Sequence, residues 1–283
     1  MIENTQKRII ALGYFDCVHV AHRQILGETR RIAASVGVLS AAVTFSDNVK
    51  STRVYDFEER KTLLGALVDD VISLEFTEKV KNTLPDAYLN MLKNEYGAVG
   101  FVCGYDHKFG KNAAGNCDFL RDYCKRNGLI LSVIDKYVID NEEVSATKIK
   151  QLLQFGEIEK ANKLLVTPYH ITDTVVRGRG EGHLFGFPTI NFMPKTGKIL
   201  PKTGVYSTMS DIILGKYKSV TNVGTKPTFN DDNKSVETFI GDGFNGDLYG
   251  KTIVLYFYKY LRDVKKFSDP ESLRLQILED IRR

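Results

Sequence analysis

The chain has 283 residues, enough for about two domains, and its 43% hydrophobic and 26% charged residues describe a folded globular protein. Its 39 basic and 35 acidic residues give a net charge of +4, and the basic pairs are scattered, so no concentrated basic face for nucleic acid is expected. No apolar run reaches the roughly 18 residues of a membrane span, and the start lacks a secretory signal, which predicts a cytoplasmic protein without a membrane partner.

The first half alternates apolar runs of strand length with amphipathic segments. The expected strands are 8–15, 38–45, 71–76, 98–106 and 129–135, and the expected helices are 22–37, 57–68, 85–96 and 117–128. This alternation predicts right-handed βαβ units and a doubly wound, Rossmann-like parallel sheet. Ligands of such sheets bind at the carboxyl ends of the strands.

The pattern changes near residue 145. Two short helices broken at Gly156 are followed, after Pro168, by strands and turns, including a hairpin that we expect to turn at Leu214-Gly215. A final helix starts with Asp269 as its cap and Pro270 at its first position. The second half therefore reads as a small β-barrel domain closed by a helix, with domain limits of 1–166 and 167–283.

The stretch GYFDCVHVAH at 13–22 lies where a strand ends and a helix begins. Backbone N–H groups point outward at such a turn, and His19 and His22 can both reach a phosphate there. Two other interpretations stay open, a metal site and an ordinary pair of surface histidines. The four cysteines form no CxxC pair and are expected to be free thiols.

This stretch resembles the GxFDGxHxGH motif of the FMN adenylyltransferase domain in bacterial bifunctional riboflavin kinase/FAD synthetases. CGYDHKFG at 103–110 and VSATKIK at 144–150 resemble two further motifs of that domain. The resemblance implies that His19 and His22 are catalytic. It implies that the nucleotide is bound by Gly13, Phe15, Asp16, Asp106, Ser145, Thr147 and Lys150.

Several positions depart from this family pattern. Cys17 and Ala21 replace glycines, Ala146 replaces a serine, and Lys150 replaces an arginine. SDN at 46–48 stands where the family has PHP. The methyl group of Ala21 is harmless only if the backbone φ there is negative.

The stretch VVRGRGEGHLFGFPTINF at 175–192 is rich in glycine, which lets a flap fold closely over phosphates. In the extended segment that follows, Thr189 and Asn191 point to the same face. Two neutral oxygen ligands together with nucleotide phosphates suit Mg²⁺.

This second stretch closely resembles the GxxxGRxLGFPTAN signature of riboflavin kinase, and further landmarks follow in order up to the C-terminal helix. The resemblance implies that Glu237 accepts the proton of the riboflavin 5′-hydroxyl and that Thr189 and Asn191 hold Mg²⁺. It implies that the flavin lies in an apolar slot near the last helix, in contact with Tyr206 and Arg262. It implies that the nucleotide is covered by Gly178, Gly180, Gly182, His183 and Gly186. His183 and Phe239 depart from the residues usual in the family.

The leading hypothesis is a bifunctional transferase of flavin cofactor synthesis. Its C-terminal kinase domain would phosphorylate riboflavin to FMN with ATP and Mg²⁺, and its N-terminal nucleotidyltransferase domain would adenylylate FMN to FAD. A kinase with an inactive N-terminal domain is the first alternative. A non-catalytic flavin-binding regulator is the second. All the expected partners are small molecules, namely riboflavin, FMN and ATP.

Overall fold

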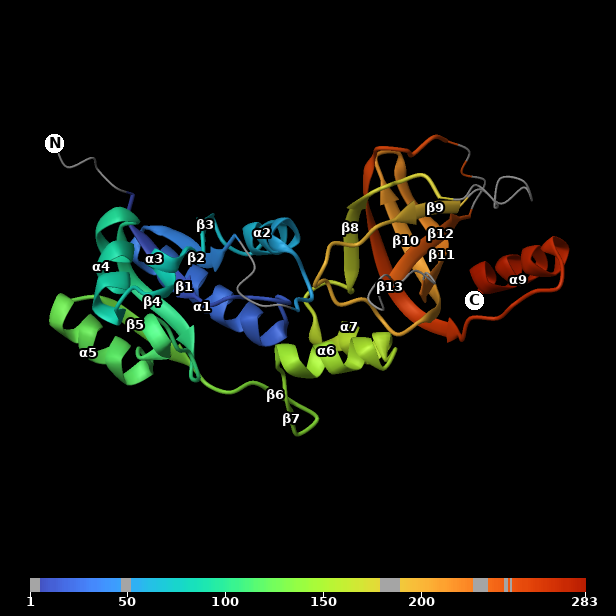
Figure 1. The fold of residues 1–283 in the computed structure, drawn as a ribbon. Helices are drawn as coiled ribbons and strands as arrows, with labels where there is room; N and C mark the ends of the chain where they lie inside the picture. Colours follow the sequence, from blue (N-terminus) through green and yellow to red (C-terminus); the bar gives the residue numbers. More distant parts are fainter. Residues whose placement is uncertain (1–5, 47–51, 179–188, 226–233, 242–243, 245) are drawn as a thin grey trace. The chain divides into compact units, whose positions relative to one another are not determined.

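The computed structural model describes residues 6–46, 52–178, 189–225, 234–241, 244 and 246–283. They form two compact units, Met1–Ala146 and Thr147–Arg283 (Figure 1). Helices α6 (Ala146–Gln154) and α7 (Ile158–Leu164) thus pack almost entirely with the second unit, and the domain limits of 1–166 and 167–283 stay a prediction. No helix in the described part of the chain is long and apolar enough to cross a bilayer.

The first unit is built on a five-stranded sheet in the order β3-β2-β1-β4-β5, with every pairing parallel. The strands are β1 (Arg8–Leu12), β2 (Leu39–Phe45), β3 (Asp70–Leu74), β4 (Ala98–Gly104) and β5 (Ile130–Ile134). The helices are α1 (Val20–Val36), α2 (Phe57–Gly65), α3 (Glu78–Lys81), α4 (Pro85–Glu95) and α5 (Cys117–Asn127). This arrangement confirms the predicted doubly wound sheet, and all nine predicted elements of this half are found.

Three short elements of the first unit were not predicted. They are α3, the 3₁₀ turn η1 (Lys111–Ala113), and the hairpin of β6 (Val138–Ile139) with β7 (Glu142–Glu143). Each helix or strand among them has four residues or fewer, which is too short for a hydrophobic period to show in the sequence.

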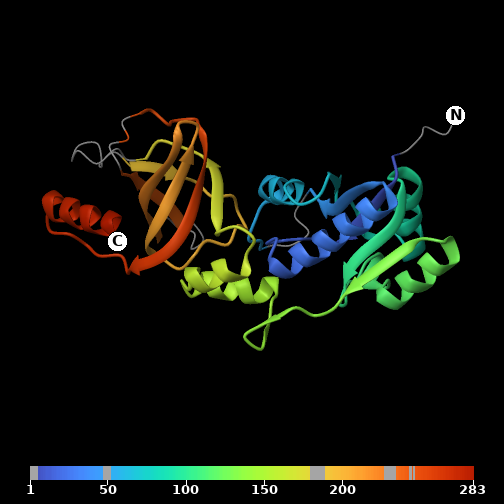
Figure 2. The ribbon, with the colours of Figure 1, turned by 180° about the vertical axis from the view of Figure 1, so that it is seen from behind.

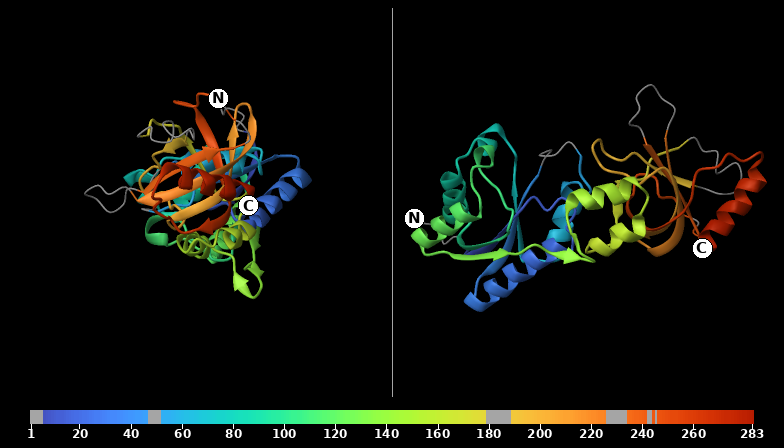
Figure 3. Two further views of the ribbon diagram at one scale, coloured as in Figure 1. Left: turned by 90° about the vertical axis from the view of Figure 1, so that its right-hand side faces the viewer. Right: turned by 90° about the horizontal axis from the view of Figure 1, so that it is seen from below.

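Helices cover both faces of this sheet. Leu89, Leu92 and Leu120 of α4 and α5 pack on one face in a core that includes Ile10 and Phe101 of the strands. Right-handed connections place α1 and α2 on the opposite face, as the views in Figure 3 allow the reader to follow. The ends of β1, β2 and β4 therefore meet at one edge, where the predicted phosphate loop lies.

The second unit contains a curled antiparallel sheet of six strands in the order β8-β13-β10-β11-β12-β9 (Figure 2). The strands are β8 (His170–Thr174), β9 (Thr189–Phe192), β10 (Gly204–Ile212), β11 (Gly215–Thr225), β12 (Lys234–Ile240) and β13 (Thr252–Arg262). The two edges meet at one point, because the Val176 N–H donates to the Asn191 carbonyl at 2.9 Å. This contact closes the curl at one end and confirms the barrel-like fold.

The β10–β11 hairpin pairs Ile212 with Gly215, so its turn is made by residues 213–214, one position earlier than predicted. The final helix, α9 (Pro270–Arg282), starts as predicted, with the Asp269 carboxylate accepting a bond of 2.8 Å from the Ser272 N–H. Helix α9 contacts β11 of this sheet.

The side chains on one face of β10, β11 and β12 form a buried chain of hydroxyl groups. Thr208 bonds to Ser219 and to Thr221, at 2.8 Å each, and Thr221 bonds to Thr238 at 2.9 Å. Ser210 joins the chain through Ser219 at 3.0 Å. All five residues are buried, and their hydroxyl groups form hydrogen bonds with one another instead of with water.

Candidate active sites

The loop from β1 to α1 is held in an unusual conformation. Phe15 and Val18 have positive φ values of 54° and 40°, which are uncommon for such residues. A Cβ on Gly13 would lie 2.8 Å from the Phe15 ring, so the chain needs glycine there. The buried Asp16 accepts a bond of 3.0 Å from the Val54 N–H, which ties the loop to the segment before α2.

His19 and His22 cap the start of α1 together. The His22 N–H donates to Nδ1 of His19 at 3.1 Å, and the His19 N–H donates to Nδ1 of His22 at 3.3 Å. The two rings stack with their centroids 3.5 Å apart. The edge of Phe15 meets His22 at a centroid distance of 5.1 Å.

This double cap assigns the protonation of both rings. A nitrogen that accepts a hydrogen bond keeps its lone pair, so a neutral ring must carry its proton on Nε2. Burial lowers the pKa of His19 to about 4, so this ring is neutral near pH 7. Each neutral ring then offers an Nε2–H donor, beside a helix start that carries no acidic residue in its first turn. Such donors at a helix start suit a phosphate, although the buried Asp16 carboxylate also acts on His19 electrostatically.

The same stretch brings together three groups of the type that bind metals. The ligating atoms of Cys17, His19 and His22 lie within 4.8 Å of one another. Metal binding through Nε2 would move the remaining ring proton to Nδ1, which already accepts a backbone N–H. A metal would therefore break both capping bonds, and the geometry favours phosphate over metal at this site.

Ala21 is the second residue of α1 and has helical angles, with a negative φ. Its methyl group is therefore compatible with the local backbone, which meets the condition stated above for a functional loop. The change from glycine does not distort the histidine pair.

The remaining residues predicted for the first site are spread over both units. Asp106 is exposed in the turn after β4, and Ser145 directly precedes α6. Thr147 and Lys150 are on α6, in the part that belongs to the second unit. Their position opposite the histidines stays a prediction.

In the second unit, the strand pairing aligns a row of side chains across one face of the sheet. Arg262 is paired with Val205, Val205 with Asn222, Asn222 with Glu237, and Glu237 with Asn191. Paired residues of antiparallel strands project to the same face, so Glu237 stands between two asparagines.

Thr189 joins this group from the neighbouring row. Its hydroxyl donates to Oε1 of Glu237 at 2.5 Å, a short, charge-assisted bond. The bond orients the carboxylate, and Oε2 is left for another donor. The structure thus brings together Thr189, Asn191 and Glu237, as predicted from separate motifs.

Thr189 and Glu237 border a pocket of about 280 Å³. Its lining is Thr189, Val205, Val220, Asn222, Glu237, Phe239, Arg262, Val264, Lys265, Phe267, Pro270, Leu273, Ile277 and Asp280. Polar groups come from the sheet, and α9 contributes mainly apolar ones. The volume is close to the lower end of small-molecule sites, roughly 300 Å³. An apolar slot beside the last helix is thus present, as predicted.

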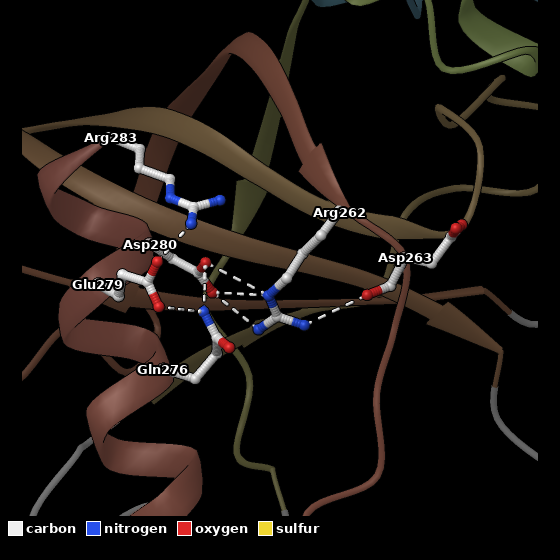
Figure 4. A network of polar contacts seen from close by, with 6 residues as sticks. All are labelled: Arg262, Asp263, Gln276, Glu279, Asp280 and Arg283. Atoms are coloured by element: carbon white, nitrogen blue, oxygen red, sulfur yellow. Dashed lines mark hydrogen bonds and ion pairs between the residues drawn. The ribbon is translucent and has the colours of Figure 1, made fainter.

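Arg262 lines the pocket, but its guanidinium is bound to α9 (Figure 4). Its Nη2 and Nε lie 2.7 Å and 3.0 Å from Oδ2 of Asp280, whose side chain is fully buried. Gln276 adds a bond of 3.1 Å to the same carboxylate. The pair fastens α9 to β13, a role that sequence reasoning missed, because nothing near Arg262 marks Asp280 as its partner.

Tyr206 is placed on the other face of β10. It is fully buried and its hydroxyl donates to the Lys202 carbonyl at 2.6 Å. Burial raises the pKa of this phenol. The structure does not bring Tyr206 together with Glu237, and its predicted flavin contact has no support from the pocket lining.

Gly178, predicted to cover the nucleotide, is in close contact with Asn191. A Cβ on Gly178 would lie 2.7 Å from the Asn191 amide carbon, so a glycine is needed for this approach. The other predicted residues of that stretch lie outside the described residues, namely Gly180, Gly182, His183 and Gly186.

Comparison with known proteins covers both units. Residues 1–148 match the family model described as FAD synthetase, and residues 165–283 match the one described as riboflavin kinase. The chain is 30% identical to the bifunctional riboflavin kinase/FMN adenylyltransferase of Bacillus subtilis, over 98% of this chain and 92% of that protein. It is 29% identical to the protein of the same name from Listeria monocytogenes, over 96% and 90%.

Among solved structures, the chain resembles a crystal structure from Streptococcus pneumoniae described as a macrolide-efflux protein. The TM-score is 0.86, the identity is 24%, and the match covers 99% of this chain and 94% of the other. At this identity the likeness supports the fold alone.

Proposed function

The chain belongs to the bifunctional riboflavin kinase/FMN adenylyltransferase family, and on this premise we propose which residues carry its two reactions. It is an enzyme of flavin cofactor synthesis that phosphorylates riboflavin to FMN and adenylylates FMN to FAD, with ATP as the other substrate. Matches over both units favour this function over a kinase alone and over a non-catalytic regulator. We place the enzyme in the cytoplasm, where ATP is available.

For the kinase reaction, we propose that Glu237 acts on the riboflavin 5′-hydroxyl. The hydrogen bond from Thr189 occupies one carboxylate oxygen, so the other can accept the hydroxyl proton as the oxygen attacks the γ-phosphate. Such a transfer requires mainly alignment and neutralisation of charge. The apolar side of the pocket, formed with α9, suits the flavin ring.

We propose that Thr189 and Asn191 hold Mg²⁺ together with the ATP phosphates. The residues fit the ion, since the Thr189 hydroxyl donates its proton to Glu237 and its oxygen lone pairs remain for a cation. When bound, Mg²⁺ neutralises charge on the transferred phosphate. Gly178 leaves the space beside the Asn191 amide that any side chain would fill.

For the adenylyl transfer, we propose that His19 and His22 donate from Nε2 to the ATP phosphates at the start of α1. Neutral rings suit this role, because each Nε2–H can donate a hydrogen bond to the developing negative charge and still keep its proton. Ser145, Thr147 and Lys150 would contribute further phosphate contacts, and Asp106 would contact the nucleotide. The FMN phosphate attacks the α-phosphorus, and pyrophosphate leaves.

The observation that carries the kinase proposal is the Thr189–Glu237 bond at the polar side of the pocket. The test incubates the purified chain with riboflavin or with FMN, in MgATP, and separates the flavins chromatographically. We expect Glu237→Gln to abolish FMN formation and leave FAD formation from FMN intact. We expect His22→Ala to do the reverse.

Each variant is thus the control for the other. If Glu237→Gln phosphorylates riboflavin at the wild-type rate, Glu237 is not the base. If FAD never forms from FMN in the wild-type chain, the adenylyl-transfer assignment is wrong and the chain is a kinase alone.

A further inference from the structure

We infer that Asn222 selects the substrate of the kinase site by accepting a hydrogen bond from the 4′-hydroxyl of the ribityl chain. This hydroxyl is the neighbour of the one that is phosphorylated. The inference rests on the proposed kinase function and adds to it a residue that reads the sugar-alcohol part of the flavin.

Asn222 has a defined place beside the reacting group. It is the strand partner of Glu237 on one side and of Val205 on the other. Directly opposite residues of antiparallel strands have Cβ atoms about 5 Å apart, so a molecule bound at Glu237 is within reach of the Asn222 amide. Both residues line the pocket.

The amide oxygen of Asn222 is an unsatisfied hydrogen-bond acceptor in the described part of the chain. This atom is buried and has no hydrogen-bond partner among the described residues. A buried acceptor without a partner is unfavourable, and native proteins tolerate one mainly where a ligand or water supplies the donor. One neighbouring row on the same face holds Val220 and Phe239 before Thr189, whose hydroxyl proton is already given to Glu237. The other holds Gly224 and Ser235, and Ser235 makes no hydrogen bond to this oxygen.

Riboflavin has two kinds of donor, the ribityl hydroxyls and the N–H at position 3 of the ring. The apolar lining from α9, Leu273 and Ile277, together with Phe267, suits the ring. The row of paired residues runs from Glu237 through Asn222 and Val205 to Arg262, whose guanidinium is bound to Asp280 of α9. Asn222 is therefore on the side of Glu237 that leads toward α9. The part of riboflavin that crosses this position is the chain carbon next to the reacting hydroxyl, and its hydroxyl group supplies the donor.

The test is a double-mutant cycle across protein and substrate. We would measure kcat/KM for phosphorylation of riboflavin and of 4′-deoxyriboflavin by the wild-type chain and by Asn222→Leu, which keeps the size and removes the amide. We expect the wild-type chain to lose roughly tenfold on the deoxy analogue, the effect of one buried hydrogen bond. We expect Asn222→Leu to be roughly tenfold slower on riboflavin and to lose nothing further on the analogue.

Two controls separate this effect from general damage. Lys218→Ala changes an exposed residue of the same strand and should keep the wild-type preference for riboflavin. FMN adenylylation by the same preparations reports on the other unit. Asn222→Ala serves as a second variant if the leucine disturbs the sheet.

Several outcomes would overturn the inference. One is a wild-type chain that phosphorylates both flavins equally well, whatever the variants do. Another is an equal loss on the deoxy analogue with and without the amide. A third is coupling of Asn222 to 3-methylriboflavin, which would assign the amide to the ring instead. A wild-type chain that makes no FMN at all would instead refute the proposed kinase function.

Discussion

Replacing Asp280 by asparagine tests whether the buried ion pair with Arg262 holds the flavin pocket together. The carboxylate receives both Nη2 and Nε of Arg262, at 2.7 Å and 3.0 Å, and is fully buried. Removing one charge of such a pair leaves the other uncompensated, at a cost of about 3–5 kcal/mol. A helix of 13 residues has little stability of its own, so we expect the cost to fall on the docking of α9.

This cost has a direct kinetic consequence. A loss of about 3 kcal/mol changes the docking equilibrium of α9 by roughly a hundredfold. Because α9 contributes Leu273 and Ile277 to the pocket, the undocked enzyme would lack one wall of the flavin site. We therefore expect the KM for riboflavin to rise at least tenfold, since only the docked fraction binds.

The assay measures the KM for riboflavin together with hydrogen exchange of the α9 amides. The matched control is Glu279→Gln, because Glu279 is exposed on the same helix and pairs with Arg283 at the surface, where ion pairs contribute little. FMN adenylylation should be unchanged in both variants. Wild-type KM and wild-type exchange in Asp280→Asn would refute the reasoning.

Three further predictions concern single side chains. Gly178→Ala should reduce kinase activity at least tenfold, because the new Cβ would displace the Asn191 amide; unchanged activity would show that the contact relaxes freely. Burial lowers the pKa of His107 to about 4. As the pH falls below about 6.5, this ring is protonated in the unfolded chain but not in the folded one, so the free energy of unfolding decreases by about 2 kcal/mol by pH 5. His107→Phe should therefore narrow the difference between the thermal midpoints at pH 7 and pH 5, and an undiminished difference would contradict this. Ala21→Gly should lower the thermal midpoint through a helix cost of about 1 kcal/mol and leave the rate of FAD formation unchanged, whereas a faster rate would show that the methyl group hinders the phosphates.

Sequence reasoning succeeded where the signal is local. The strands and helices follow from hydrophobic periodicity, and the start of α9 follows from Asp269 and Pro270. It failed where a side chain depends on distant pairing. Asn222 is a partner of Glu237 only through the register of β11 with β12, which no local pattern displays.

The face of a strand was also hidden from the sequence. Val205 and Tyr206 are consecutive residues of β10, and both could serve an apolar site. Only the folded sheet shows that Val205 lines the pocket while Tyr206 is buried with its hydroxyl bound to Lys202. Both side chains suit either the protein core or an apolar pocket, so the sequence did not indicate which of the two faces the flavin.

The buried hydroxyl chain of β10, β11 and β12 has a consequence for how accurately this sheet is assembled. Thr208, Thr221 and Thr238 bond to one another across three strands, and each bond exists in one alignment only. Sliding β11 by one residue would turn the hydroxyls of Ser219 and Thr221 to the pocket face and bring Asn222 to the buried face, because side chains alternate along a strand. A misaligned sheet would thus bury polar groups without hydrogen-bond partners, which makes it less stable than the native sheet. By favouring one strand alignment, the threonines secure the position of Glu237, although they do not contact the substrate.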